Sequence, residues 1–245
     1  MHSVASHAGH EPTHSHPGHA GSGHPVIECA ISLGKPLSRD LVDKVTAVCD
    51  EGEDAGANAL VCIHLDGSGT AEANRDGAHP AIDVGLVNHW ERALRRLERL
   101  PVVTVAVATG EIGGLGLALL LCTDYRLVDE ASHLRLAQPG QPPLPGMLLH
   151  RLSNQLGVTL TRRMALLERR LDSHEALRHG LIDEVCANVG AAARAVLQDL
   201  RQRDLAHASM QRRLILEASS VSYEDALGSH LAACDRVLRH ATQTP

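Results

Sequence analysis

Aromatic residues are almost missing from this sequence. Phe is absent, and one Trp and two Tyr supply the aromatic content of the 245 residues. Hydrophobic residues still make up 44% of the chain, so the core has to consist of Leu, Val, Ile and Ala. Those residues favour helices packed on a small aliphatic sheet. A chain of this length can bury a sizeable core, and we expect one domain plus a terminal tail.

Lysine is scarce as well. It occurs only at Lys35 and Lys44, and the formal net charge of the chain is −6. Binding to nucleic acid depends on many clustered cations, so this charge argues against a nucleic-acid partner. The N-terminus has no charged region followed by an apolar run, and the longest apolar segment, Leu115 to Cys122, is far shorter than the roughly 20 residues that span a bilayer. We therefore expect a cytoplasmic protein with no membrane partner.

A CxxC pair is also missing. The six cysteines are scattered, and most of them lie in apolar stretches. They are Cys29, Cys49, Cys62, Cys122, Cys186 and Cys234. This distribution indicates reduced residues of the core.

Seven histidines crowd into residues 1–25, among Gly, Ser, Pro and Ala. A segment with so little to bury is predicted to be a disordered tail, and the folded domain is expected over residues 26–245. Neutral imidazoles at the spacing of His14 and His16 bind Zn²⁺, Ni²⁺ or Cu²⁺. The favoured alternative is a permissive low-complexity tail, because disorder provides no fixed ligand geometry.

Beyond the tail, apolar periodicity predicts strands that alternate with helices. Strands are expected at Val26 to Leu33, Ala59 to Leu65, Val102 to Ala108 and, as two strands joined by a turn, Tyr125 to Leu136. Helices are expected at Leu37 to Cys49, Val84 to Leu100, His150 to Leu156, Thr161 to Leu167, Ser173 to His179 with Ser173 as its cap, Gly190 to Arg203, and Met210 to Arg239 with a break near Ser219 to Ser222. Asp66 to Pro80 is predicted to be a surface loop and a candidate functional segment. The alternation favours the α/β class.

Thr104 to Asp124, TVAVATGEIGGLGLALLLCTD, is the most informative segment. A buried strand runs into Gly110, Gly113, Gly114 and Gly116 at the start of an apolar helix. Glycines let a ligand approach the backbone, and the N–H groups of a first helical turn suit an oxyanion. The spacings GxGxxG and GxxxxGK[ST] are not present. Tight packing of strand against helix is the alternative interpretation.

The segment resembles the signature of the enoyl-CoA hydratase (crotonase) superfamily. The matching parts are Leu100-Pro101, the strand Val102 to Ala108, Gly110, Gly113-Gly114-Leu115-Gly116, and Cys122-Thr123-Asp124. The later segments YRLVDEASHLRL, PLPGMLLHRL and ALLERRLDSHEALRHGLIDEV resemble the superfamily in the same order, so the resemblance extends over Val26 to Arg239. It implies a crotonase-like spiral of ββα units with a C-terminal helical region.

Two segments, VNHWERALRRLERLP and SYEDALGSHLAACDR, are similar to a narrower branch of that superfamily. This branch comprises the small hydratase-like proteins of dihydroxyphenylglycine biosynthesis, which work beside a chalcone-synthase-like, type III polyketide synthase. The resemblance implies an acyl-CoA thioester as ligand and assembly as trimers, with a hetero-complex as the alternative. It implies no metal or organic cofactor in the core.

Members of the superfamily hold the thioester carbonyl oxygen between two backbone N–H groups, which stabilise the enolate. The resemblance assigns one donor to Leu115 N–H, flanked by Gly114 and Gly116. The other donor belongs to the segment HPAIDVG, in which Asp83 matches the superfamily's Asp. That register puts Pro80, which has no N–H, at the donor position. Either the donor shifts to His79 or Ala81, or this half of the oxyanion hole is absent.

Hydratases of the superfamily also use two glutamates, and the matching positions here are Ala118 and Gln138. Neither exchanges a proton as a carboxylate does, so ordinary hydration by two glutamates is not expected. Glu111 is the favoured substitute, because a carboxylate beside a helix N-terminus is placed to interact with a ligand or the helix dipole. Asp83, His89 and His133 are further candidates, although such residues are more often structural.

Four arginines follow one another along the helix predicted at Val84 to Leu100. They are Arg92, Arg95, Arg96 and Arg99. Their guanidinium groups suit CoA phosphates or an acidic partner. The favoured alternative is a solvated helix face on which Glu91 and Glu98 are the counter-charges.

The resemblance therefore supports two hypotheses for function. The first is a dehydratase or isomerase that acts on a polyketide-derived acyl-CoA thioester on the way to dihydroxyphenylacetyl-CoA. The second is a noncatalytic partner that binds a type III polyketide synthase and stimulates it. A third hypothesis, metal storage, is confined to residues 1–25.

Overall fold

The computed structural model describes residues 24–68, 82–137, 146–218 and 220–243. Strands and helices alternate in its first half, and helices predominate in its second half. The strands are β1 (Val26–Ser32), β2 (Leu60–Gly67), β3 (Val103–Ile112), β4 (Tyr125–Asp129), β5 (His133–Leu134), β6 (Leu171–Asp172) and β7 (Glu184–Cys186). The helices are α1 (Arg39–Ala55), the 3₁₀ turn η1 (Gly56–Asn58), α2 (Val84–Glu98), α3 (Gly114–Leu121), α4 (Leu148–Leu156), α5 (Val158–Leu166), α6 (Ser173–Arg178), α7 (Val189–Leu200), α8 (Leu205–Ala218) and α9 (Tyr223–Gln243). The predicted α/β class is confirmed.

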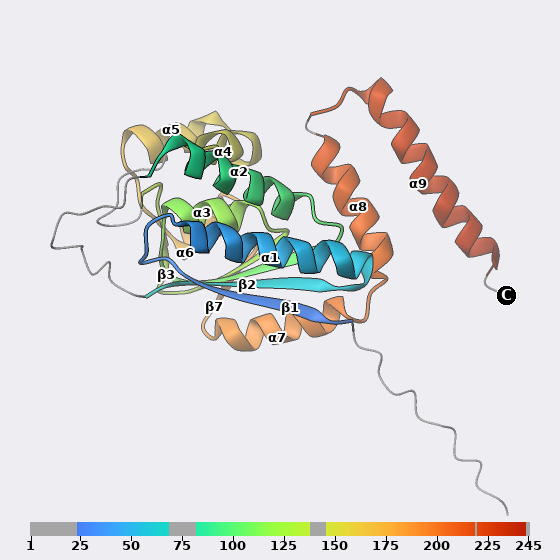
Figure 1. Ribbon diagram of the computed structural model, residues 1–245, viewed down its shortest axis with the longest axis horizontal. Helices are drawn as coiled ribbons and strands as arrows, with labels where there is room; N and C mark the ends of the chain where they lie inside the picture. Colours follow the sequence, from blue (N-terminus) through green and yellow to red (C-terminus); the bar gives the residue numbers. More distant parts are fainter. Residues whose placement is uncertain (1–23, 69–81, 138–145, 219, 244–245) are drawn as a thin grey trace, which may run out of the picture.

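Strands β1, β2, β3, β4 and β7 form, in that order, a parallel sheet. The end of β3 also pairs with β5, which in turn pairs antiparallel with β6. Helices α1, α2 and α3 lie on one face of the sheet and α7 on the other (Figure 1). Parallel sheets covered on both faces have continuous apolar strands, which is why β2 and β3 are buried along most of their length.

The larger of two apolar clusters lies between the sheet and helices α1 to α3, and the smaller one lies between the sheet and α7. Aliphatic residues dominate both clusters, as the composition predicts. Trp90 on α2 is 2% exposed and belongs to the larger cluster. Five of the six cysteines are buried and Cys234 is exposed, so the expectation of reduced core cysteines is confirmed for those five.

The backbones of β2 and β3 approach each other closely at Gly67 and Gly110, which are in register. A Cβ atom built on Gly67 would lie 2.2 Å from the carbonyl oxygen of Glu111, and one built on Gly110 would lie 2.5 Å from the carbonyl carbon of Gly67. Gly110 also has a φ of +77°, and its N–H donates to Ser132 Oγ at 2.8 Å. No side chain fits at this crossing, so the glycines are required by the backbone geometry.

Two local predictions need correction. Strand β3 continues through Gly110 to Ile112, so Glu111 lies in a strand and not in a turn, because the positive φ of Gly110 distorts the strand without ending it. Helix α6 is capped by Asp172 instead of Ser173. The Asp172 carboxylate accepts from Glu175 N–H, and the Glu175 carboxylate accepts from Asp172 N–H. This capping box begins one residue before the predicted cap.

Helices α8 and α9 form a hairpin that stands beside the α/β body (Figure 1). The break between them agrees with the one predicted near Ser219 to Ser222. Arg212 on α8 attaches the hairpin to the body: its Nε lies 2.6 Å from both carboxylate oxygens of Asp124, and its other nitrogens donate to the carbonyls of Leu100 and Glu98. Asp124 also accepts from the N–H and hydroxyl of Thr104. The Asp at the end of the sequence signature thus joins β3 to α8.

Within the described ranges, no helix is long and apolar enough to cross a membrane. The predicted histidine-rich tail lies almost entirely in residues 1–23, outside the described residues.

We predict that Gly110→Ala destabilises the fold more than Gly180→Ala. Both glycines have positive φ, which costs an alanine roughly 1–2 kcal/mol. A Cβ atom added at Gly180 would meet nothing within 4 Å. The clash at Gly110 adds about 1–3 kcal/mol. Urea unfolding of both variants measures the difference. Equal losses would show that β2 can move away from β3.

Candidate active site

The first turn of α3 presents backbone donors. Gly113 is the N-cap residue and provides no side-chain cap, and Gly114 takes a φ of +47°. Gly114 N–H donates to the carbonyl of Leu136 at 2.9 Å, and Gly116 N–H donates to that of Gly113. Leu115 N–H, between them, has no acceptor among the described residues. The structure therefore leaves Leu115 N–H available at the positive end of the helix dipole.

Gly116 is required by packing. A Cβ atom at this position would lie 2.4 Å from Leu33 Cδ1, so α3 lies against the residue that follows β1. Close packing of helix and strand, the alternative interpretation of these glycines, is thus correct for Gly116. The same packing fixes the helix turn in which Leu115 N–H has no acceptor among the described residues.

A small apolar cavity adjoins this turn. Its walls come from α2, α3 and the segment that begins α4, and its volume is about 10 Å³. The lining residues are Val87, Trp90, Glu91, Gly114, Leu115, Ala118, Gly146 and Leu148. A volume of this size holds about one water molecule. The cavity next to Leu115 therefore has no room for a bulky acyl group.

Ala118 lines the cavity one helical turn after Leu115, where the superfamily resemblance expects a glutamate. The methyl group of alanine cannot transfer a proton. Gln138 and Ala81, which we predicted to contact the substrate, lie outside the described residues. Of the two predicted donors, Leu115 lies within the described residues and the one expected at residues 79–81 does not, and Ala118 stands at one of the two carboxylate positions.

Glu111, the favoured substitute base, lies on β3 and forms an ion pair with Arg170. Its carboxylate is also 3.9 Å from Nδ1 of His133, on the neighbouring strand β5. Among the described residues, those that line the cavity do not include Glu111. Glu111 and His133 lie side by side where β3 pairs with β5, and neither lines the cavity that contains Ala118.

Asp83 caps helix α2. Its Oδ1 accepts from Leu86 N–H at 2.6 Å, and the residue is exposed. This hydrogen bond accounts for an Asp at this position through helix formation. His89, a further candidate, is exposed on α2.

Three of the four arginines lie on α2 and Arg99 is its C-cap, and two of those on the helix form ion pairs at the surface. Arg96 binds Asp50 and Glu53 of α1, and Arg95 binds Glu98. The side chain of Arg96 is 37% exposed, and exposed pairs contribute little to stability. The interpretation as a solvated, salt-bridged face is therefore confirmed for these two residues.

A buried ion pair between α2 and α4 was not predicted. Glu91 Oε2 accepts from Arg151 Nη1 at 2.7 Å, and the two side chains are 16% and 7% exposed. Glu91 Oε1 accepts from Met147 N–H, and Glu98 lies 4.0 Å from Arg151 Nε. We had assigned Glu91 and Glu98 to the arginines of their own helix, which is correct for Glu98 with Arg95 and wrong for Glu91. The buried apolar spacing of α4 was the signal that an arginine at position 151 points inward.

Beyond this ion pair lies a second cavity, of about 940 Å³, between α2, the C-terminal end of α3, α4 and α8. Cys122 lies in its wall, and burial raises the pKa of this thiol to about 12, so the thiol stays neutral. Arg126 also contributes to the wall. Burial lowers the pKa of its guanidinium, which donates to the carbonyls of Leu121, Thr123 and Leu181.

Comparison with known proteins identifies the family. The model of the enoyl-CoA hydratase/isomerase family matches residues 68–244. The chain is 40% identical to an enoyl-CoA hydratase of Amycolatopsis orientalis over 205 residues, which cover 84% of this chain and 92% of that protein. The chain belongs to the enoyl-CoA hydratase/isomerase family. The superfamily resemblance of the sequence signature is thereby confirmed.

More distant relatives agree. A probable mitochondrial enoyl-CoA hydratase 2 of Arabidopsis thaliana is 24% identical over 200 residues, which are 75% of this chain and 64% of that protein. The crystal structure of an enoyl-CoA hydratase from Bacillus anthracis superposes with a TM-score of 0.72 at 20% identity, over 89% of this chain and 88% of that one. The crotonase fold expected from the sequence is therefore the fold of this family member.

We predict that Asp83→Ala lowers the free energy of unfolding by about 1 kcal/mol, the usual loss when a helix cap is removed. Asp83→Asn should recover most of it, because an amide oxygen also accepts from Leu86 N–H. Urea unfolding measures both variants. If Asp83 instead contacts the substrate, Asp83→Ala will weaken acyl-CoA binding at least tenfold and leave the unfolding midpoint unchanged.

Proposed function

We propose that this family member binds an acyl-CoA thioester with its carbonyl oxygen on Leu115 N–H and acts as a dehydratase or isomerase on a polyketide-derived acyl group. One observation carries the proposal: Leu115 N–H, at the N-terminus of α3, has no acceptor among the described residues and adjoins an apolar cavity. A donor in this position stabilises an enolate oxygen more than a ketone-like carbonyl, and that difference lowers the barrier.

The alanine at position 118 limits the chemistry to substrates that need little acid–base assistance. A polyketide ring precursor meets this condition, because loss of water from it creates an aromatic ring. In this step a water molecule takes the proton from the carbon next to the thioester carbonyl, and the enolate rests on Leu115 N–H. The bond from the β-carbon to its hydroxyl oxygen then breaks, and the leaving hydroxide takes up that proton to become water. The similarity of two segments to the dihydroxyphenylglycine branch supports dihydroxyphenylacetyl-CoA as the product.

A second candidate function is favoured by the volume beside Leu115. A cavity of about 10 Å³ has no space for an aromatic ring, and its lining has alanine at position 118, where the resemblance expects a glutamate. Both features suit a noncatalytic member of the family that binds a type III polyketide synthase and increases its turnover.

The exposed face of α9 supports association with a further chain. The leucines Leu227, Leu231 and Leu238 are 42%, 58% and 66% exposed, and Cys234 completes a stripe with spacings of four, three and four residues. Such spacing is typical of a helix that packs on another helix. We propose a homotrimer in which α9 packs on a neighbouring copy, and a hetero-complex with the synthase as the alternative. We also propose the cytoplasm, where the buried free thiols remain reduced.

Replacement of Leu115 by Pro tests the proposed donor. The first turn of a helix tolerates Pro, so Leu115→Pro should fold but lacks the N–H, whereas Leu115→Ala keeps it. With the cognate synthase and malonyl-CoA, wild type and Leu115→Ala should yield the aromatic thioester. Leu115→Pro should yield it about 10²- to 10³-fold more slowly, as expected for the loss of one oxyanion donor.

The folded state of Leu115→Pro is verified by circular dichroism and thermal unfolding. If the folded variant stimulates the synthase as well as wild type does, the oxyanion site is idle and the noncatalytic candidate is correct.

The double variant Leu231→Glu/Leu238→Glu should remain folded but become monomeric, because it places charges in the exposed stripe of α9. Size-exclusion chromatography with light scattering measures the mass, with Arg236→Glu as a control of equal charge. Retention of the wild-type mass by the double variant would exclude this face as the contact.

A further inference from the structure

The two cavities lie end to end along the same three helices. Leu115 and Ala118 of α3 line the small cavity, and Leu121 and Cys122, one turn further along, line the large one. In the same way Val87 and Trp90 of α2 line the small cavity, and Arg95 and Glu98, further along α2, line the large one. The large cavity is therefore the continuation of the small cavity away from the oxyanion donor.

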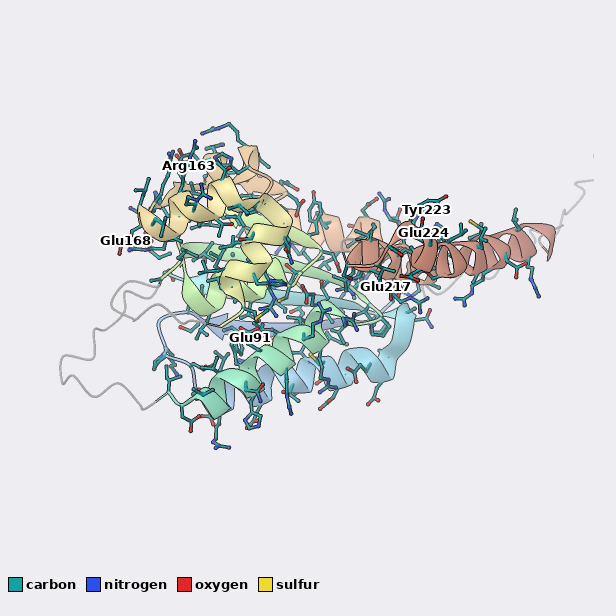
Figure 2. The ribbon with its side chains drawn as sticks, turned by 90° about the horizontal axis from the view of Figure 1, so that it is seen from above. Glu91, Arg163, Glu168, Glu217, Tyr223 and Glu224 are labelled. Carbon is teal, nitrogen blue, oxygen red and sulfur yellow. The ribbon has the colours of Figure 1, made fainter. Side chains whose placement is uncertain are left out.

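Glu91 lies at the boundary, because it lines both cavities. Figure 2 shows it between α2 and the pair of helices α4 and α5. Its carboxylate is held by Met147 N–H at 2.8 Å and by Arg151 Nη1 at 2.7 Å, and a Cβ atom on Gly146 would lie 2.5 Å from Glu91 Oε1. These contacts hold the carboxylate between α2 and α4, where it separates the small cavity of about 10 Å³ from the large cavity of about 940 Å³.

The large cavity suits an acyl group that carries oxygen atoms. Its volume of about 940 Å³ is in the range of small-molecule sites. Its wall combines apolar residues such as Leu121 and Ile215 with hydrogen-bonding side chains such as Arg151, His150 and Asn154. A guanidinium has five N–H donors, and one of those on Arg151 is engaged by Glu91. Arg151 is buried, whereas His150 and Asn154 are exposed, so the Arg151 guanidinium is the donor that favours ketone and hydroxyl groups over a bare alkyl chain.

The ion pair can open without leaving Arg151 uncompensated. Glu98 Oε1 lies 4.0 Å from Arg151 Nε, on the side of the arginine away from the small cavity. When the Glu91 carboxylate turns aside, the buried guanidinium still has a carboxylate partner, so the large penalty for an isolated buried charge does not arise.

We infer that the large cavity receives the acyl group of the bound thioester, and that the Glu91–Arg151 pair is the partition that determines which acyl groups reach it. The favoured class is an acyl group that is larger than acetyl and carries several oxygens. This inference rests on the proposed function, because it requires the thioester carbonyl to bind at Leu115.

The test is a binding series. Acetyl-CoA, hexanoyl-CoA, phenylacetyl-CoA and dihydroxyphenylacetyl-CoA are titrated into the full chain by isothermal titration calorimetry, with wild type and Glu91→Ala compared. The expected result in Glu91→Ala is a gain in affinity for the three larger thioesters that exceeds any change in the affinity for acetyl-CoA by at least tenfold. The dihydroxyphenylacetyl thioester should bind at least tenfold more tightly than the phenylacetyl thioester to both proteins.

Two further variants control the series. Glu53→Ala removes a carboxylate that also binds an arginine of α2, but on the face towards α1, and should change none of the affinities. If Glu91→Ala does not fold, the double variant Glu91→Ala/Arg151→Met removes the buried charge together with its partner and is used instead.

The outcomes separate the two claims. If acetyl-CoA binds wild type but the removal of Glu91 gives no gain for larger thioesters, the partition is wrong and the proposed function stands. A preference for hexanoyl-CoA over the hydroxylated thioester overturns the assigned substrate class. If neither CoA nor acetyl-CoA binds wild type, the proposed function itself fails.

Discussion

The contact of two backbones at Gly67 and Gly110 sets how closely β2 and β3 lie just before the chain enters α3. It brings β2 and β3 so close that a Cβ atom on either glycine would clash with the other strand. Because β3 continues past this crossing to Ile112, its end pairs with β5 and the chain turns into α3 at Gly113. Leu115 lies shortly after this crossing in the chain, so the crossing positions the end of β3 that leads to its N–H.

The chain combines a preserved donor with an altered set of ionisable groups. Leu115 keeps the N–H that the family mechanism needs, since a backbone donor is independent of the side chain. Alanine stands at position 118, where the resemblance expects a glutamate. The carboxylate of Glu91 lines the same cavity and forms an ion pair with Arg151. A carboxylate bound by a guanidinium and a backbone N–H shapes the cavity more than it transfers protons. Under the proposed function, the acidic residue of this cavity selects the acyl group and does not transfer protons.

The sequence predicts most helices and strands well because the spacing of their apolar residues is visible within each segment. The strands β1 to β3, the break before α9 and the turn before α3 were all expected from periodicity and glycine. The predicted strand ends at Ala108, before Gly110, because only the partner glycine on β2 reveals that the backbones cross there and that the strand continues. The Glu91–Arg151 pair was missed because its members are 60 residues apart, and the arginines on α2 offered nearer partners. Such errors arise where a contact joins distant segments.

Infrared difference spectroscopy of bound acetyl-CoA carrying ¹³C at the thioester carbonyl tests the central claim most directly. A hydrogen bond from Leu115 N–H draws electron density onto the oxygen and weakens the carbon–oxygen bond. We predict that the labelled carbonyl band shifts to lower frequency on binding to wild type. The shift should persist in a variant with alanine at position 115 and vanish in a folded variant with proline there. A bound thioester whose carbonyl absorbs at its free frequency would contradict the assignment of this turn as the oxyanion site.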